Sequence, residues 1–321
     1  MISKAMIREN LTRCLEATSF LALPGLKKGK VRDAYDLGDK LVLVTTDRQS
    51  AFDRVLACVP FKGQVLNQVS AFWFEATRDI VANQILGVPD PNVTVAKKCR
   101  PFPVEFVVRG YLTGTTDTSA WMLYSRGTRD VCGNILPEGM VKNQALPKPI
   151  LTPTTKSDEH DRPLSAQEIV KEGLIEEAIW NKLEAIVFGL FQRGAEIAAR
   201  NGLILVDTKY ELGLDENGEV TLIDEVHTPD SSRYWLALSY EERIAKGLEP
   251  ENIDKEFLRL WFKDHCDPYH DKDLPKAPDD LVVELSSRYI LLYEMITGKP
   301  IEVDLTLPVQ TRIVKNLAEY L

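Results

Sequence analysis

The chain has 321 residues, and its 48 acidic residues against 39 Lys and Arg give a formal net charge of −9. This acidic balance argues against a general nucleic-acid binder, and no uncharged apolar run approaches the roughly 20 residues of a membrane helix. Five scattered cysteines without a C-x-x-C pair indicate reduced thiols rather than a disulfide framework or a zinc site. We therefore expect a globular, cytoplasmic protein of about two domains with no membrane or nucleic-acid partner. The sequence leaves its oligomeric state open.

The first hundred residues are rich in strand patterns. The stretch "KVRDAYDLGDKLVLVTTD" (30–47) predicts two strands joined near Gly38 and Asp39. Residues 67–85 follow, with apolar positions at helical spacing, and they predict a helix. These patterns predict a β-rich N-terminal lobe over residues 1–100.

The rest of the chain changes from strand patterns to helix patterns. The stretch "PVEFVVRGYLTG" (103–114) predicts a strand that ends in a glycine-containing turn. Five prolines within 133–165 predict an extended surface excursion, a kind of segment that often forms a binding loop. A capping box, "SAQE" at 165–168, and an apolar stripe over 175–200 predict two helices. We therefore expect a mixed α/β lobe over residues 101–321.

One predicted strand carries charges directly after a buried apolar run. In "VDTKYELG" (206–213), alternation along the strand places Asp207, Lys209 and Glu211 on the same face. Such a face is either a solvated surface, on which Lys209 partly balances the acids, or part of a site for a charged ligand.

The turn after this strand decides what faces Glu211. Asn217 and Gly218 between two extended runs predict a two-residue hairpin turn, which would place Glu211 opposite Asp224. Facing carboxylates repel each other unless a cation lies between them, and two hard oxygen ligands suit Mg²⁺ or Mn²⁺. Lys209 could then contact a phosphate bound to that metal. A longer loop would shift the register.

Two N-terminal motifs carry further charges. The motif "GKVRDAY" (29–35) presents Lys30 and Arg32 on one strand face, as in hairpins that cover nucleotide phosphates, but its spacing matches neither a Walker loop nor the kinase glycine pattern. The motif "TTDRQSAFDR" (45–54) places mixed charges, Asp53 among them, after an apolar strand. An exposed basic strand and an ordinary surface turn are the alternative interpretations.

Six stretches of the chain, including the motifs just described, resemble the ordered motif set of the phosphoribosylaminoimidazole-succinocarboxamide synthase (SAICAR synthetase) family. The matching stretches are "GKVRDAY", "TTDRQSAFD", "VVRGYLTGT", "TPTTKSDEHD", "VDTKYELG" and "IDEVHTPDSSRYW". They span residues 29–235, and the first twenty or so residues carry no match. The resemblance implies a two-lobed, kinase-like fold with a β-rich N-terminal lobe, a mixed α/β C-terminal lobe and ATP in the cleft.

The same resemblance implies an activity. The expected enzyme is an ATP-dependent ligase of purine biosynthesis that joins 5-amino-1-(5-phosphoribosyl)imidazole-4-carboxylate (CAIR) to L-aspartate. The products would be SAICAR, ADP and phosphate, and the reaction would pass through an acyl phosphate. ATP, CAIR and L-aspartate are therefore the expected partners, with Mg²⁺ or Mn²⁺ as the cofactor.

The resemblance also implies roles for individual residues. Lys209 and Lys156 would be catalytic and would support the transferred phosphoryl group of ATP. The other expected ATP-binding residues are Lys30 and Arg32 at the phosphates and Arg100 and Phe102 at the adenine. The expected metal ligands are Glu211 and Asp224. The expected substrate-binding residues are Asp53, Arg109, Thr115, Asp161, Ser232 and Arg233.

Two other functions fit parts of the sequence. A kinase-like phosphotransferase acting on a small hydroxyl substrate would share the phosphate motifs but would lack "PDSSRYW" and would not need aspartate. A catalytically silent nucleotide-binding regulator would have lost a metal acid or a phosphate lysine, whereas Lys30, Lys209, Glu211 and Asp224 are all present.

Overall fold

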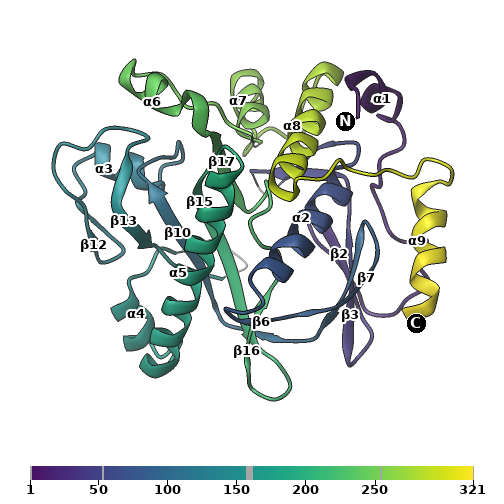
Figure 1. Cartoon of the computed structure of the whole chain (residues 1–321), viewed down its shortest axis with the longest axis horizontal. Coiled ribbons are helices and arrows are strands. Elements are labelled where there is room, and N and C mark those ends of the chain that lie inside the picture. Colours follow the sequence, from purple (N-terminus) through teal and green to yellow (C-terminus); the bar gives the residue numbers. More distant parts are fainter. Residues whose placement is uncertain (1, 53, 157–161, 254, 321) are drawn as a thin grey trace.

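The computed structural model describes residues 2–52, 54–156, 162–253 and 255–320, and it contains two main sheets with helices packed around them (Figure 1). This mixed α and β architecture agrees with the expected fold class. The expected substrate-binding residues Asp53 and Asp161 lie outside the described residues.

The first sheet is antiparallel and comes from the N-terminal part of the chain. Its strand order is β1-β2-β3-β8-β7. The strands are β1 (Leu26–Lys28), β2 (Arg32–Asp36), β3 (Lys40–Thr45), β7 (Ile85–Asp90) and β8 (Val93–Lys97). The predicted first hairpin is confirmed as β2–β3, and Gly38, with a φ of 100°, lies in its turn. A separate strand pair follows β3 and consists of β4 (Arg48–Ala51) and β5 (Arg54–Cys58).

The predicted helix over 67–85 is right in its first half and wrong in its second. Helix α2 (Lys62–Ala76) ends where the Thr77 hydroxyl donates to the carbonyl oxygen of Trp73 at 2.7 Å. The chain then turns into β6 (Ala82–Asn83), which pairs with a strand of the second sheet. The apolar residues after Ala76 keep a helical spacing, but they lie in this turn and in the strands after it rather than in a further turn of the helix.

The second sheet is organised around one long strand, β15 (Leu203–Leu214), which carries the charged "VDTKYELG" motif. Its main path is β13-β10-β15-β16-β6, and β9, β14 and β17 pair at its sides. The remaining strands are β9 (Arg100–Pro101), β10 (Val104–Tyr111), β13 (Ala145–Leu151), β14 (Thr154–Thr155), β16 (Val220–Ile223) and β17 (Ser232–Leu236). Four strands, β9, β10, β16 and β17, pair with β15. This pairing fixes the orientation of β15 and therefore the side of the sheet on which its charged side chains lie.

The proline-rich segment is not simply a surface excursion. A small hairpin of β11 (Asp130–Val131) and β12 (Asn134–Ile135) overlaps its start, and β13 then pairs with β10, opposing Ile150 to Arg109. Residues Ala145–Leu151 are extended and largely exposed, as predicted, but they form a sheet strand rather than part of a loop. Prolines are tolerated there because β13 is an edge strand, where a missing N–H breaks no ladder.

Beyond residue 235 most of the described chain is helical, as predicted. The helices other than α2 are α1 (Lys4–Glu9), α3 (Ala120–Ser125), α4 (Ala166–Lys171), α5 (Glu177–Arg200), α6 (Ala237–Ala245), α7 (Glu256–His265), α8 (Asp279–Thr297), α9 (Val309–Leu317) and the 3₁₀ turn η1 (Ala318–Tyr320). The predicted capping box is confirmed at the start of α4, where Ser165 and Glu168 exchange hydrogen bonds. The predicted long amphipathic helix is confirmed as α5, which lies along β15 (Figure 1).

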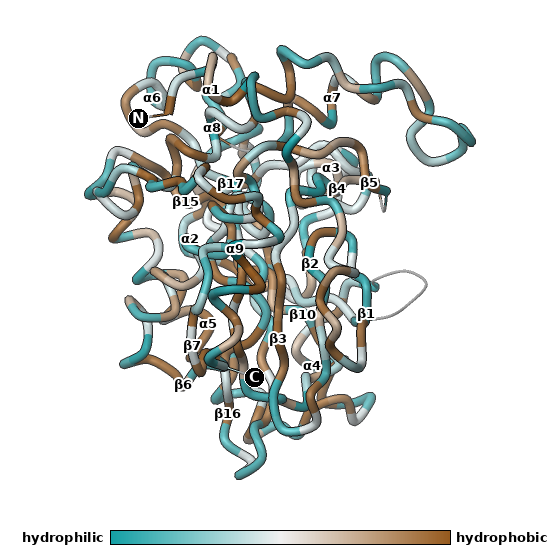
Figure 2. Tube along the Cα trace, turned by 90° about the vertical axis from the view of Figure 1, so that its right-hand side faces the viewer, coloured by the Kyte–Doolittle hydropathy of each residue, from teal (hydrophilic) through white to brown (hydrophobic). Residues whose placement is uncertain are grey.

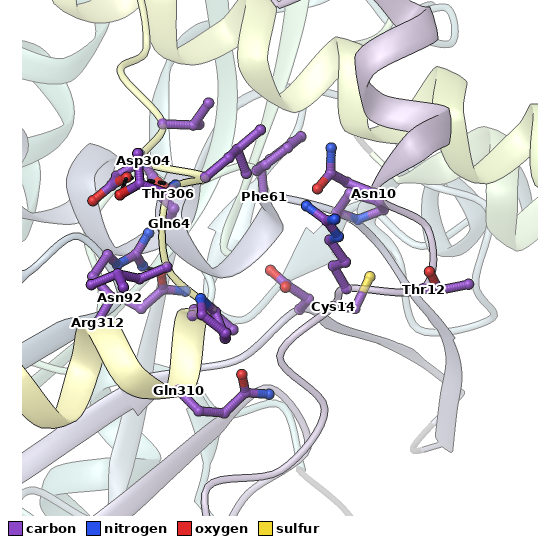
Figure 3. A pocket seen from close by; sticks show the side chains of 18 residues that line it. Asn10, Thr12, Cys14, Phe61, Gln64, Asn92, Asp304, Thr306, Gln310 and Arg312 are labelled. Carbon is purple, nitrogen blue, oxygen red and sulfur yellow. Dashed lines mark hydrogen bonds between the residues drawn. The ribbon is translucent and has the colours of Figure 1, made fainter.

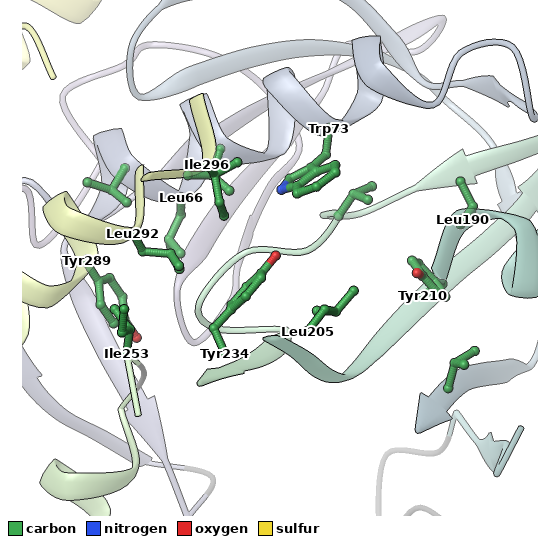
Figure 4. Close-up of a cluster of buried hydrophobic side chains, with 14 of the residues drawn as sticks. Leu66, Trp73, Leu190, Leu205, Tyr210, Tyr234, Ile253, Tyr289, Leu292 and Ile296 are labelled. Atoms are coloured by element: carbon green, nitrogen blue, oxygen red, sulfur yellow. The ribbon is translucent and has the colours of Figure 1, made fainter. Parts of the chain in front are cut away.

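The main apolar core lies between α2, α5, α8 and the second sheet. Figure 4 shows Trp73 of α2, Tyr210 of β15 and Tyr234 of β17 within it, and all three are buried. Figure 2 shows the hydrophilic β15–β16 loop at the periphery of the molecule. Every helix in the described parts of the chain is too short or too polar to span a bilayer.

Candidate active site

The β15–β16 hairpin has a different register from the predicted one. Asp215 and Glu219 close a three-residue loop, and the Asp215 carboxylate accepts the N–H groups of Asn217 and Glu219 at 2.9 and 3.0 Å. Gly218 takes the left-handed conformation that such loops require. Glu211 therefore lies opposite Ile223, and the predicted Glu211–Asp224 pairing across the ladder is wrong.

The carboxylates of Glu211 and Asp224 nevertheless converge on one ammonium group. Asp224 follows the end of β16 with a φ of 65°, a conformation that Asp tolerates better than most residues. Lys209 Nζ lies 2.8 Å from Glu211 Oε1 and 4.0 Å from Asp224 Oδ2. Lys209 also pairs with Glu105 at 2.7 Å, and Lys156 pairs with the second oxygen of Glu211. Sequence reasoning missed Glu105, which lies on the neighbouring strand β10.

Arg32 joins this charge cluster from the first sheet. Its guanidinium lies 2.6 Å from Asp224 Oδ1 and 3.6 Å from Glu225 Oε2, so it links β2 to the end of β16. Lys30 was expected on the same strand face, but it lies in the bend before β2 and is exposed. Arg48 braces this bend by donating to the carbonyl oxygens of Gly29 and Lys30. The structure therefore places an arginine inside the cluster and a lysine on the exposed bend before it.

Electrostatics keeps the cluster charged. Burial opposes ionisation of Glu211, but Lys209 and Lys156 outweigh burial and lower the pKa of this carboxyl to about 2. Burial likewise opposes the charged form of Lys209, but Asp224 and the other nearby carboxylates hold its pKa above the ordinary value. Both groups are therefore ionised at neutral pH.

A cavity of about 240 Å³ opens beside the cluster. Lys209 belongs to the cluster and also lines this cavity. Asp207 lies between two arginines in its wall: Arg109 at 3.3 Å and Arg233 at 2.8 Å. The Arg109 guanidinium also donates to the Thr152 hydroxyl at 2.9 Å. These contacts fix two planar cations in the geometry that suits carboxylate or phosphate groups.

Several cavity residues escaped sequence reasoning. Lys255 and Arg259, four residues apart at the start of α7, add two cations, and Asp230 and Glu256 add two acids. Their helical spacing and the position of Asp230 inside "PDSSRYW" were the available signals. Lys62 on α2 was also missed, and it pairs with Asp230 at 2.7 Å although it has no exposed side-chain surface.

The remaining predicted residues lie around these two features. Ser232 lines the cavity, is buried, and donates its hydroxyl to Thr208 at 2.7 Å. Thr115 donates to the cavity residue Glu256 at 2.9 Å. Phe102 is half-buried beyond the cluster, where its N–H donates to the carbonyl oxygen of Leu212, and Arg100 is exposed next to it.

A separate cavity of about 490 Å³ lies between the two ends of the chain, where Asn10, Phe61 and Arg312 line it (Figure 3). It also receives Asp47 of the "TTDRQSAFDR" motif. The Asp47 carboxylate accepts the backbone N–H groups of Leu15 and Gly63, and burial raises its pKa to about 6. Asp47 therefore ties the N-terminal segment to α2 and lies apart from the charge cluster.

A divalent metal fits the cluster. Glu211 and Asp224 supply hard oxygen ligands that already converge on one cation, Lys209. The described residues contain no group of three or more His, Cys, Asp or Glu arranged around one metal position. Two carboxylates nevertheless match Mg²⁺, which commonly completes its coordination with water and substrate phosphates.

Comparisons with known proteins agree on one family. The family model described as SAICAR synthetase matches residues 25–275. A phosphoribosylaminoimidazole-succinocarboxamide synthase of Legionella pneumophila (strain Lens) is 59% identical over 309 residues, covering 96% of this chain and 99% of that protein. A solved SAICAR synthase of Saccharomyces cerevisiae, complexed with SAICAR, has a TM-score of 0.78 and 31% identity, covering 90% of this chain and 100% of that chain.

A third match carries a nucleotide. A solved SAICAR synthetase in complex with ADP has a TM-score of 0.65 and 26% identity, covering 87% of this chain and 100% of that chain. The likeness to these solved enzymes confirms the expected two-lobed α/β fold class, and the match of the family model and of the Legionella relative extends over most of the sequence. The chain belongs to the SAICAR synthetase family.

Proposed function

We propose that the protein joins CAIR to L-aspartate, converting ATP to ADP and phosphate, by way of an acyl phosphate on the CAIR carboxylate. Membership of the SAICAR synthetase family gives the overall reaction. The observation that carries the residue assignments is the position of Lys209, which lies both in a carboxylate cluster suited to a metal and in the wall of a cationic cavity. One ammonium group thus borders both the place for nucleotide phosphates and the place for an anionic acceptor.

On the nucleotide side, Arg32, Lys156 and Lys209 would bind the phosphates of ATP, and Lys30 would cover them from the exposed bend. Arg100 and Phe102 would border the adenine, because they lie beside the part of β15 that follows Glu211. The carboxylates that now pair with the three cations would be partly released when phosphate oxygens take their place. A solved relative in complex with ADP supports nucleotide binding at this fold.

Glu211 and Asp224 would hold Mg²⁺, and Mn²⁺ has the same preference for oxygen ligands. When bound, the metal would neutralise charge on the β- and γ-phosphates and orient them for transfer. The residues of this chain would contribute the fixed positions of the two carboxylates and of Lys209.

On the substrate side, Arg109 and Arg233 would bind the anionic groups of CAIR. Ser232 and Thr115 would add hydroxyl contacts, and the two residues outside the described parts of the chain, Asp53 and Asp161, are also proposed to contact substrate. The cavity walls contain five cations and three acids, which favours an anionic ligand. The relative complexed with SAICAR supports ribotide binding in this family.

The chemistry explains why both sides must meet. A carboxylate resists attack by an amine, so its oxygen first accepts the γ-phosphoryl group, and ADP leaves. The aspartate amine then attacks the acyl carbon, the new C–N bond forms, the C–O bond to phosphate breaks, and the amine loses a proton. Lys209 and Lys156 would stabilise negative charge during the transfer, which depends mainly on positioning and electrostatics.

Two further expectations remain proposals. We place the boundary between the β-rich and the α/β lobe near residue 100, although β6 from the first part of the chain joins the second sheet. The expected cytoplasmic location is likewise a proposal, which fractionation of the native organism would test.

One assay tests the function. Purified protein is incubated with Mg-ATP, CAIR and L-aspartate, and both ADP and the succinocarboxamide product are followed. We expect ADP and product in equal amounts, with ADP dependent on CAIR. ADP formation that ignores both co-substrates would overturn the proposal, and transfer to a small hydroxyl compound would favour the phosphotransferase. Nucleotide binding without any turnover would favour the silent regulator.

A further inference from the structure

One buried ion pair joins a residue of the cavity wall, Asp230, to a lysine behind it, Lys62. Lys62, the first residue of α2, has no exposed side-chain surface, and its Nζ lies 2.7 Å from Asp230 Oδ2. Asp230 itself is 5% exposed by its side chain and lines the cavity. A pair of this kind is costly to bury, so its position next to a binding cavity requires a reason beyond stability.

Asp230 is held by three residues, of which Lys62 is one. Its Oδ1 accepts a hydrogen bond from the Tyr289 hydroxyl at 2.6 Å and lies 3.8 Å from Lys255 Nζ. Lys255 also donates to the carbonyl oxygen of Asp230 at 3.3 Å. The carboxylate thus connects a lysine outside the cavity, Lys62, with a lysine inside it, Lys255.

The three acids of the cavity wall differ in one respect. Asp207 pairs with the cavity arginines Arg109 and Arg233, and Glu256 pairs with the cavity arginine Arg259. Asp230 has an ion-pair partner, Lys62, that does not line the cavity. Lys62 therefore balances the negative charge of Asp230 from outside the cavity. Lys255 is held less tightly by Asp230, at 3.8 Å, and its ammonium group can face a ligand.

We propose that Lys62 is a positioning residue: by neutralising Asp230 from behind the wall, it holds Lys255 as a ligand-directed cation for the anionic substrate. Burial opposes the charge of Asp230, yet Lys255 and Lys62 lower the pKa of its carboxyl to about 2, so the acid is ionised. Without Lys62, this carboxylate would be satisfied by Lys255 alone, and the lysine would turn from the ligand toward the wall. The inference rests on the proposed function, because it assigns CAIR to this cavity.

A double-mutant cycle tests the inference. The KM for CAIR and kcat are measured for the wild type, Lys62→Met, Lys255→Met and the double variant, with the KM for ATP as an internal reference. We expect each single variant to raise the KM for CAIR about tenfold, with kcat changed much less. The double variant should also show about a tenfold increase rather than a hundredfold one, because both changes remove the same interaction.

A matched control separates this role from general destabilisation. Leu66→Ala removes a buried side chain from the same helix, and Leu66 does not line the cavity. It should lower the melting temperature and leave the KM for CAIR unchanged. Should Lys62→Met fail to fold, Lys62→Met combined with Asp230→Asn removes the unpaired charge and should restore folding. Adding Lys255→Met to this variant should then raise the KM for CAIR about tenfold, because Lys255 no longer has a carboxylate to turn toward.

The outcomes are distinct. An unchanged KM in folded Lys62→Met, independent effects of the two lysines, or an equal KM increase in Leu66→Ala would overturn the positioning role. Wild-type protein that neither binds CAIR in a calorimetric titration nor forms product would instead overturn the proposed function. The two failures therefore differ in whether the wild type is active.

Discussion

Lys209 Nζ lies 2.8 Å from the carboxylate of Glu211, two residues along the same strand, and this pair marks the border between the charge cluster and the cavity. Strand alternation places both side chains on one face of β15, so their contact is built into the backbone. A phosphoryl group in transfer at this border would meet the lysine directly. This relation makes Lys209 the most sensitive residue of the proposed mechanism.

The variant Lys209→Met should therefore lose turnover. We expect kcat to fall roughly 10²–10³-fold, the usual effect of removing one preorganised donor from a transition state. Steady-state ADP release measures it. Lys182→Met, at an exposed position of α5, is the matched control and should behave as the wild type. A kcat within a factor of three of the wild type in Lys209→Met would contradict the catalytic role.

The variant Asp224→Asn should weaken the metal site while keeping the fold. The amide retains the shape of the side chain but loses the charge that a divalent cation needs. A higher Mg²⁺ concentration should therefore be required for the half-maximal rate, and the rate at limiting Mg²⁺ should fall sharply. A Mg²⁺ titration of the rate, together with circular dichroism, tests both parts. Glu219→Gln, in the exposed hairpin loop, serves as the control. Near-normal rates of Asp224→Asn at limiting Mg²⁺ would refute the assignment.

Local patterns allowed much of the fold to be predicted. The β2–β3 hairpin, the capping box of α4 and the amphipathic α5 each depend on residues close in sequence, and all three are confirmed. The register at Glu211 was missed because a single side chain, Asp215, closes a longer loop than Asn217 and Gly218 suggest. A shift of one residue changes the partner of every side chain on the strand.

The charge cluster and the cavity were harder to predict than the strands that carry them. Glu211 and Asp224 meet at Lys209 despite the wrong register, because the backbone of Asp224 turns into the left-handed region after β16. Lys62 and Asp230 are 168 residues apart, and nothing in the local sequence of either residue indicates the other. Contacts between distant segments depend on how α2 packs against the second sheet, which one sequence does not reveal.

Arginine at positions 109 and 233 should not be replaceable by lysine. Both guanidinium groups contact Asp207, and a planar fork can bind a carboxylate or phosphate with two parallel hydrogen bonds, whereas an ammonium cannot. We expect Arg233→Lys to raise the KM for CAIR about 10- to 100-fold, since a hydrogen bond to a charged group contributes roughly 1.5–3 kcal/mol. Initial rates at varied CAIR concentrations measure it. Arg126→Lys, an exposed arginine, should leave the KM unaltered, and a similar KM in both variants would count against the substrate role of Arg233.

The last prediction concerns a buried histidine near the core. His227 has no exposed surface; its Nε2 shares a hydrogen bond with the Tyr210 hydroxyl, and its ring lies 4.7 Å from that of Trp73 between centroids. Burial lowers the pKa of His227 to about 3, well below the ordinary value of 6.5. Between these two pH values the unfolded chain carries a proton at this histidine and the folded chain does not. The free energy of unfolding should therefore fall on acidification through this window, by up to about 1.4 kcal/mol per pH unit from this group.

The variant His227→Gln isolates this contribution, because glutamine can keep a hydrogen bond to Tyr210 but does not titrate. Urea unfolding between pH 7 and pH 4.5 should give a steeper loss of stability in the wild type than in the variant. The difference should accumulate to roughly 2.5 kcal/mol by pH 4.5, because that pH lies two units below the ordinary pKa of 6.5 and above the folded value of about 3. Carboxylates common to both proteins, such as Glu211 and Asp230, cancel in the comparison. Parallel stability curves would mean that His227 takes up its proton over the same pH range in the folded and the unfolded chain, which would contradict the lowered pKa.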